Sequence, residues 1–136
     1  MTVDKRSVVF NRLVAGFALI FGALTIVSGG RVLFGGPEAQ AAAGNVVHFV
    51  LWFNFLSGFA YVAAAVGILL LKPWARYLAI ALAIAIVAVF ALFGWHVLSG
   101  GAYEMRTTGA MTLRSAVWIG IALYLQHRAK AAVLKA

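Results

Sequence analysis

Four long apolar stretches separated by short polar segments dominate the pattern of hydrophobic and polar positions along the chain. Each stretch is long enough to cross about 30 Å of hydrocarbon as a helix, which takes roughly 20 residues. Because hydrocarbon offers no partner for backbone N–H and C=O groups, segments that span it are helical. We therefore predict an all-α integral membrane four-helix bundle, forming a single domain over 1–136, with spans at approximately 13–34, 46–71, 74–98 and 107–126.

The spacing of small residues predicts which helix faces meet inside the bundle, since small side chains let membrane helices approach closely. Residues three or four positions apart lie on one helical stripe. The predicted stripes are Ala15, Ala18, Gly22, Thr25 and Gly29 in the first span, Ala81, Ala85, Ala88 and His96 in the third, and Gly109, Thr112, Ala116 and Gly120 in the fourth. The second span carries two faces: Asn54, Ser57, Tyr61 and Ala64 on one, and His48, Trp52, Phe55 and Phe59 on the other. We expect the aromatic face to meet lipid or a neighbouring subunit.

The composition agrees with a membrane protein. Of 136 residues, 65% are hydrophobic and 10% are charged, whereas soluble domains are nearer half apolar and a quarter charged. The chain contains no cysteine, which excludes disulfides, thiolate nucleophiles and iron–sulfur clusters. A metal would need histidine, methionine or carboxylate ligands.

The basic residues predict the orientation of the chain. The net charge is +8, but the cations stand at the ends of apolar runs and are not interleaved with aromatics, so no nucleic-acid partner is expected. Lys and Arg accumulate on the cytoplasmic side of membrane proteins. That rule places Lys5, Arg6, Arg12, Lys72, Arg76, Arg128, Lys130 and Lys135 inside and Arg31, Arg106 and Arg114 outside. We expect a bacterial inner-membrane protein with both termini cytoplasmic, one short inner turn and two longer outer connections.

A signal peptide is the alternative for the first span. A basic start and an apolar core are followed by "AQA", Ala39 to Ala41, which has the small-residue pattern of a cleavage site. The apolar core ends near Val27, about a dozen residues before this motif, which is farther than such sites usually lie. Cleavage would also delete the small-residue stripe of the first span, so we expect the span to be retained.

Charge and polarity gather between His96 and Arg114, in "HVLSGGAYEMRTTGAMTLR". Arg114 lies seven residues after Thr107, and an arginine at membrane depth is expected to face the bundle or a watery cavity and to find a partner. With Asp4 on the opposite side, the acids that remain as partners are Glu38 and Glu104. Pairing with Glu104 requires the Gly100-Gly101 pair to fold back into the bundle. The alternative is that Arg114 extends toward the surface and stacks on Trp118.

These residues predict a polar pocket on the outer side. Its expected function is to bind or translocate a small polar or anionic solute or a lipid head group. The predicted ligand-binding residues are Asn54, His96, Glu104, Arg106 and Arg114. His96 is expected to point inward because it continues the small-residue stripe of the third span, and Asn54 has an interhelical hydrogen bond as its alternative role.

Two cofactor interpretations remain open. Two histidines that face each other can ligate haem iron in a bundle, and His48 and His96 lie at similar depth. Methionine and histidine together suit Cu(I), which makes His96, Met105 and Met111 weak metal candidates, although methionine in an apolar protein usually packs.

Two motifs carry a resemblance to a known group. They are "NRLVAGFALIF", with Arg12 and Gly16 at the start of the first span, and "SGGRVLF", with Ser28, Gly29 and Arg31 at its end. With the four-span layout, they make the chain similar to DoxX-like and other small bacterial inner-membrane proteins. The resemblance implies quinone-linked redox chemistry.

Three classes of function follow. The first is the pocket protein described above. The second is a redox accessory subunit that holds quinone or haem, with His96 and Arg114 donating hydrogen bonds to a ring carbonyl. The third is a structural or assembly subunit, either as a homo-oligomer or within a membrane complex. The sequence contains no Ser–His–Asp spacing, carboxylate pair, phosphate loop or HExxH motif, so it leaves enzymatic activity open and favours a protein that is not an enzyme.

Overall fold

The computed structural model describes the backbone of residues 5–135 and the side chains of residues 5–131; Asp4 lies outside this range. The described residues form helices and no strands, which confirms the all-α prediction. The helices are α1 (Lys5–Phe34), α2 (Pro37–Ala43), α3 (His48–Leu69), α4 (Trp74–Leu98) and α5 (Met105–Lys135).

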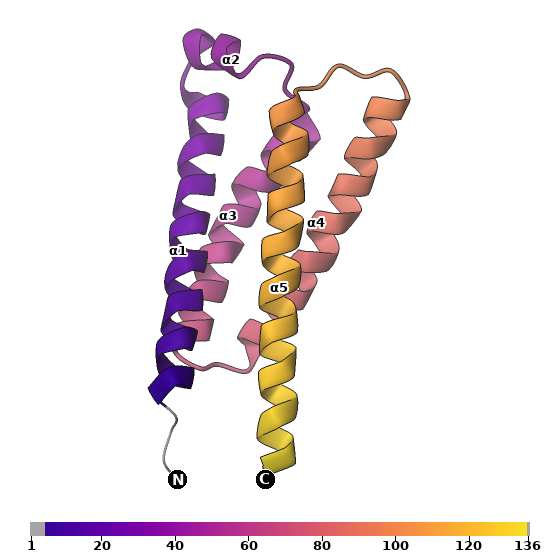
Figure 1. The fold of residues 1–136 in the computed structure, drawn as a ribbon. Coiled ribbons are helices and arrows are strands. Elements are labelled where there is room, and N and C mark those ends of the chain that lie inside the picture. Colours follow the sequence, from indigo (N-terminus) through magenta and orange to yellow (C-terminus); the bar gives the residue numbers. More distant parts are fainter. Residues whose placement is uncertain (1–4, 136) are drawn as a thin grey trace.

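Four of these helices, α1, α3, α4 and α5, are long and apolar enough to cross a membrane. They stand side by side as an elongated bundle (Figure 1). The start of α1, the α3–α4 turn and the end of α5 lie at one end, which we call the basic end, and α2 and the α4–α5 connection lie at the other, the α2 end. The four-span bundle, with one short and two longer connections, is therefore confirmed.

The helix bounds differ from the predicted spans at three places. Helix α1 starts at Lys5 and α5 continues to Lys135. The added part of α5 is rich in lysine, arginine and alanine, which are strong helix formers. Helix α2 was not predicted. Pro37 occupies its first turn, where the missing N–H costs nothing, and it is bounded by Gly36 and Gly44, whose φ angles are 87° and 76°.

Helices α1 and α3 pack with their backbones almost in contact. The predicted stripe of Ala15, Ala18, Gly22, Thr25 and Gly29 is buried, as are Ser57, Tyr61 and Ala64 of α3. A Cβ added to Gly22 would lie 3.0 Å from the carbonyl oxygen of Gly58. The small-residue prediction is therefore confirmed for this helix pair.

The predicted stripes of α4 and α5 were wrong. Ala81 and Ala88 are exposed, and so are Gly109, Thr112, Ala116 and Gly120. The buried residues are instead Ala75, Ala79, Leu82, Ala83, Ile86 and Phe93 of α4 and Met111, Trp118, Ile121, Ala122 and Leu125 of α5. The buried face of α4 combines small and large side chains, and that of α5 is mostly large, so small-residue spacing alone does not identify these faces.

The helices pack in the order α1, α3, α4, α5, and α1 and α5 are joined by side-chain hydrogen bonds of Asn11 and Thr25 on α1. At the basic end, the Nδ2 of Asn11 on α1 donates to the carbonyl of Ile68 on α3 at 2.9 Å. Its Oδ1 accepts hydrogen bonds from Tyr124, at 3.3 Å, and from Arg128 on α5. Toward the α2 end, the space between α1 and α5 widens into the pocket described next.

Candidate ligand-binding pocket

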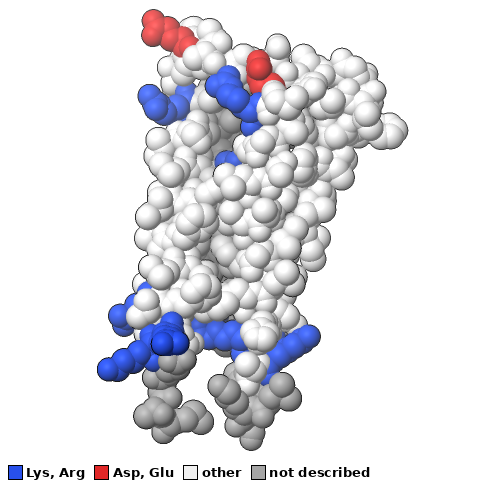
Figure 2. Space-filling view, in the orientation of Figure 1, with Lys and Arg blue, Asp and Glu red and all other residues white. Residues whose placement is uncertain are grey.

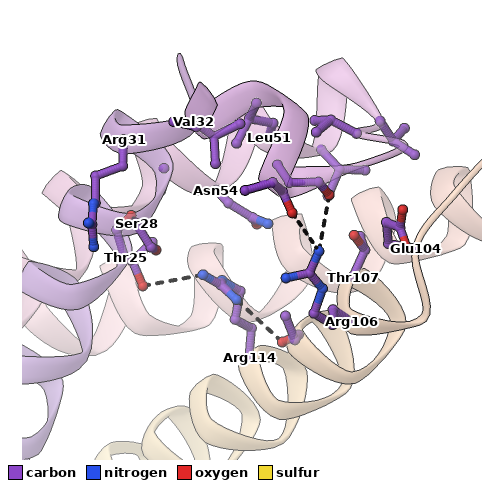
Figure 3. Close-up of a pocket in the computed structure, with 18 residues that line it drawn as sticks. Thr25, Ser28, Arg31, Val32, Leu51, Asn54, Glu104, Arg106, Thr107 and Arg114 are labelled. Carbon is purple, nitrogen blue, oxygen red and sulfur yellow. Dashed lines mark hydrogen bonds between the residues drawn. The ribbon is translucent and has the colours of Figure 1, made fainter. Parts of the chain in front are cut away.

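A cavity of about 500 Å³ lies at the α2 end of the bundle, between α1, α2, α3 and the first turns of α5 (Figure 3). We call it the Arg114 pocket. Four of the five predicted ligand-binding residues line it: Asn54, Glu104, Arg106 and Arg114. The structure thus brings together residues that are up to 60 positions apart in the sequence.

Two charged side chains lie at the roof of the pocket, which is its side nearest the helix ends at the α2 end. The guanidinium of Arg106 donates to the carbonyl oxygens of Ala42, at 3.3 Å, and Ala43, at 3.2 Å. These carbonyls end α2, where helix carbonyls lack partners within the helix and attract positive charge. Beside them, Glu104 Oε1 accepts a hydrogen bond from the backbone N–H of Asn45 at 2.9 Å. The start of α5 is therefore tied to the α2–α3 connection.

Arg114 forms the floor of the pocket. Its guanidinium donates to the Thr25 hydroxyl on α1 at 3.4 Å and to the Ala110 carbonyl of its own helix at 3.5 Å. It also lies 5.7 Å from the ring centre of Phe21. Arg114 comes nine residues after the start of α5, and Thr25 nine residues before the end of α1. At 1.5 Å per residue this is about 14 Å below both helix ends, so the positive charge lies well inside the bundle.

Below this charge lies a layer of aromatic rings. The ring of Tyr61 stacks on Phe21, with centroids 5.6 Å apart, and packs against Trp118, with centroids 4.8 Å apart. Tyr61 and Trp118 are both fully buried. The rings close the bundle beneath Arg114, so the pocket ends there.

Several buried polar atoms at and around the floor lack hydrogen-bond partners. They are Asn54 Oδ1, Tyr61 OH, Arg114 Nε, Ser115 Oγ and Trp118 Nε1. A buried polar atom without a partner costs about 1–3 kcal/mol, and native structures satisfy nearly all such atoms with protein, water or ligand. Asn54 and Arg114 both line the cavity, but the unpartnered atoms themselves, Asn54 Oδ1 and Arg114 Nε, are buried.

The expected partners of Arg114 are not the ones it has. Among the described residues it forms no ion pair with Glu38 or Glu104, because Glu104 is turned toward Asn45 in the roof. Its ring contact is with Phe21, not with Trp118, which packs against Tyr61. The guanidinium therefore remains a charge without a carboxylate partner in the part of the chain that the structure describes.

His96 lies away from the Arg114 pocket, contrary to the prediction that it points into the bundle. It lines a second hollow with Phe49, Leu92, Trp95, Ser99 and Gly101, and its Nε2 lies 2.9 Å from the carbonyl of Ala102. The spacing of small residues misplaced it because the buried face of α4 is a different one.

The Gly100-Gly101 pair ends a helix and does not re-enter the bundle. Gly100 has a φ of 86° and its N–H donates to the Val97 carbonyl at 3.0 Å, while the Gly101 N–H donates to the His96 carbonyl at 2.9 Å. These two bonds form a Schellman cap, which glycine favours because it adopts a left-handed backbone. The connection then crosses the α2 end to α5 (Figure 1).

The weak metal and haem candidates lie in different surroundings. His48 and Met105 are exposed, Met111 is fully buried in the core, and His96 is in the second hollow. Within the described residues, no three or more His, Cys, Asp or Glu side chains form a group that could hold a metal ion.

The contribution of α1 and α2 to the pocket was not predicted. Thr25, Ser28 and Arg31 line it from α1, and Ala42 and Ala43 from α2. A signal for Thr25 was present, since it is the one polar side chain on the small-residue stripe of the first span. Its pairing with Arg114 connects positions 89 residues apart, which local spacing does not reveal.

Comparisons of this chain with protein-family models, with curated proteins and with solved structures gave no match. The similarity to DoxX-like proteins therefore stays a prediction. The chemistry of the pocket rests on its own residues.

Proposed function

We propose that this chain is a multi-pass membrane protein that binds, or carries across the membrane, a small polar or anionic solute or a lipid head group in the Arg114 pocket. The observation that supports this most is the state of Arg114. It is half-buried and forms no ion pair with a described acid, and its Nε lacks a partner. A charge at membrane depth is costly and is typically found where function needs it. An anion in the cavity would offset that cost.

The distribution of charge supports an outer location for the pocket. Figure 2 shows basic side chains gathered in one belt at the basic end and a smaller group, accompanied by acids, at the α2 end. Because Lys and Arg favour the cytoplasmic side, we place the basic end in the cytoplasm of a bacterial cell and the Arg114 pocket toward the outer face of its inner membrane.

The resemblance to DoxX-like proteins would put a quinone in such a pocket instead. Asn54 and Arg114 offer hydrogen-bond donors for ring carbonyls, but a neutral quinone would leave the charge of Arg114 unbalanced. We therefore give the anion precedence. One feature supports the alternative role as an assembly subunit: the aromatic side chains of Trp52 and Phe59 on α3 are exposed.

Native mass spectrometry of the chain, gently extracted from its membrane, tests the proposal. We expect the wild-type chain to carry a non-covalent ligand that is lost in Arg114→Gln, since the substitution keeps the size but removes the charge. Arg76→Gln is the matched control: Arg76 is at the basic end, stacked on Tyr77, and this variant should keep the ligand.

Retention of the ligand by Arg114→Gln, or a wild-type chain that never carries one, would contradict the proposal. If Arg114→Gln does not fold, Asn54→Leu provides the second test, because it removes a polar atom from the cavity wall and leaves every charge in place. It should lower occupancy without lowering the unfolding temperature of the ligand-free chain, because the buried Oδ1 of Asn54 has no hydrogen bond to lose.

A further inference from the structure

We infer that the occupant of the Arg114 pocket is an amphiphile with one acidic head group, a carboxylate or a phosphate, and that it enters sideways from the bilayer between α1 and α5. This inference rests on the proposed function and narrows its ligand to one chemical class. The inference follows from three features of the pocket: the unbalanced charge of Arg114, the apolar walls, and the hollow between α1 and α5.

The unbalanced charge and weak hydrogen bonds of Arg114 select the head group. Its contacts with Thr25 and Ala110 use the two terminal nitrogens at long distances of 3.4 and 3.5 Å, and Nε has no partner. A guanidinium presents neighbouring N–H groups as a planar fork that matches the two oxygens of a carboxylate or phosphate. Because Nε itself is buried, an acidic group in the cavity would bind the terminal nitrogens of Arg114, and there it would balance the charge.

The other charges around the pocket indicate a single acidic group. Arg106 is bound to the carbonyls that end α2, and Glu104 beside it carries the opposite charge. Arg31 lines the rim but is exposed to solvent. Arg114 is therefore the one half-buried, uncompensated cation among the described lining residues.

The walls of the pocket indicate that the ligand has an apolar part attached to its head group. Between the roof and Arg114 the lining is largely aliphatic, with Val32, Val46, Val47, Val50, Leu51 and Ala110. The volume of about 500 Å³ falls in the range of about 300–1,000 Å³ typical of sites for drug-sized molecules. A bare phosphate or acetate would leave most of this apolar surface without contact.

The opening indicates that the ligand comes from the bilayer. The contacts of Arg106 and Glu104 link α5 to α2 and the α2–α3 connection on the side of the pocket nearest the helix ends. Figure 2 shows the molecule hollowed on the face where α1 and α5 stand side by side, below that roof. On this face, the hydrogen bond from Arg114 to Thr25 joins α5 to α1 at the depth of the pocket. A molecule already dissolved in the lipid has direct access there.

Thermal unfolding of the purified full-length chain in a neutral maltoside detergent tests the inference. The acidic amphiphiles are palmitate and hexadecyl phosphate, hexadecanol is the neutral match with the same chain, and acetate and inorganic phosphate are the soluble anions. We expect both acidic amphiphiles to raise the unfolding temperature in a saturable way and the other three to leave it unchanged at equal concentration. Arg114→Gln should weaken palmitate binding about tenfold to a hundredfold, as expected for loss of a charged hydrogen bond.

Further variants keep the test decisive. Arg114→Lys retains the charge but lacks the fork, so its affinity for palmitate should fall between those of wild type and Arg114→Gln. Leu51→Trp fills the cavity while leaving all arginines in place, and it should abolish the shift even if Arg114→Gln does not fold. Arg76→Gln should bind palmitate like wild type.

Each contrary result has a distinct meaning. An equal shift with hexadecanol overturns the acidic head group. An equal shift with acetate or inorganic phosphate would show that the ligand needs no apolar part and no entry from the bilayer. The ligand would then be a soluble anion. If none of the five probes acts while the native chain carries a ligand that depends on Arg114, the inference fails and the proposed function stands. If that ligand is missing too, both fail.

Discussion

At the scale of single residues, polar side chains inside the bundle link α1 to α5, a helix pair with few other contacts. Asn11 is 3% exposed and joins three helices, since it donates to the Ile68 carbonyl of α3 and accepts from Tyr124 and Arg128 of α5. Arg114 makes the equivalent link from α5 to Thr25 near the other end. The difference is that both polar side-chain atoms of Asn11 have hydrogen-bond partners within the protein, whereas Nε of Arg114 has none.

Replacing Asn11 should show how much this link contributes. Asn11→Leu keeps the volume but leaves Arg128 and Tyr124 without their acceptor, and a buried group deprived of its partner costs about 1–3 kcal/mol. We expect that loss in the free energy of unfolding, measured by denaturant titration in detergent.

Thr112→Val is the control for Asn11. The Thr112 hydroxyl is exposed and bonds to the Thr108 carbonyl of its own helix, so its loss should change stability by less than about 0.5 kcal/mol. Equal effects of the two substitutions would mean that the Asn11 link contributes nothing specific.

At the scale of helices, close backbone contact holds α1 against α3. A Cβ at Gly58 would lie 2.7 Å from Cγ1 of Ile26 and 3.2 Å from the Gly22 carbonyl oxygen. Membrane helices gain packing energy when small residues let them approach in this way. The pair forms one wall of the Arg114 pocket, so its rigidity fixes Thr25 opposite Arg114.

Adding one methyl group at this contact should separate the helices. We expect Gly58→Ala to lower the free energy of unfolding in detergent by about 1–3 kcal/mol, the usual cost of overpacking. Gly16→Ala is the control, because a Cβ there meets nothing within 4 Å, and alanine gains up to about 1 kcal/mol over glycine in a helix. A stable Gly58→Ala variant would show that α1 can move away from α3 without cost.

The helix scale also shows what the sequence predicts and what it does not. The α1 stripe is predictable because small residues at three- and four-residue spacing mark where backbones meet. The buried face of α4 is not, because its exposed Leu92 and its buried Leu82 are equally apolar, so hydrophobicity does not distinguish the two faces.

The same contrast applies to the candidate site. The cost of burying Arg114 predicts that it faces a cavity, as the structure shows. The partners that complete the pocket come from distant segments, and helix α2, whose end binds Arg106, lies in a connection without a hydrophobic pattern. The position of His96 depends on the rotation of α4, which no local signal determines.

At the scale of the whole molecule, the two ends of the bundle differ in charge and in shape. At the basic end, Asn11 is hydrogen-bonded to Ile68, Tyr124 and Arg128. The α2 end contains the pocket (Figure 3). The orientation of the chain therefore decides which leaflet can deliver a ligand. The positive-inside rule gives the outer leaflet, because the basic end is then cytoplasmic.

Labelling of single cysteines tests this orientation, since the chain has no cysteine of its own. Gln40→Cys lies on α2, and Leu70→Cys follows α3 at the basic end; both positions are exposed, and neither change alters a charge. We expect Gln40→Cys to react with a membrane-impermeant maleimide in intact cells and Leu70→Cys to react only after permeabilisation, with the cysteine-free chain as the blank. The reverse pattern would place the pocket at the cytoplasmic leaflet. The bundle and the chemistry of Arg114 would stand, but an acidic amphiphile would then have to come from the inner leaflet.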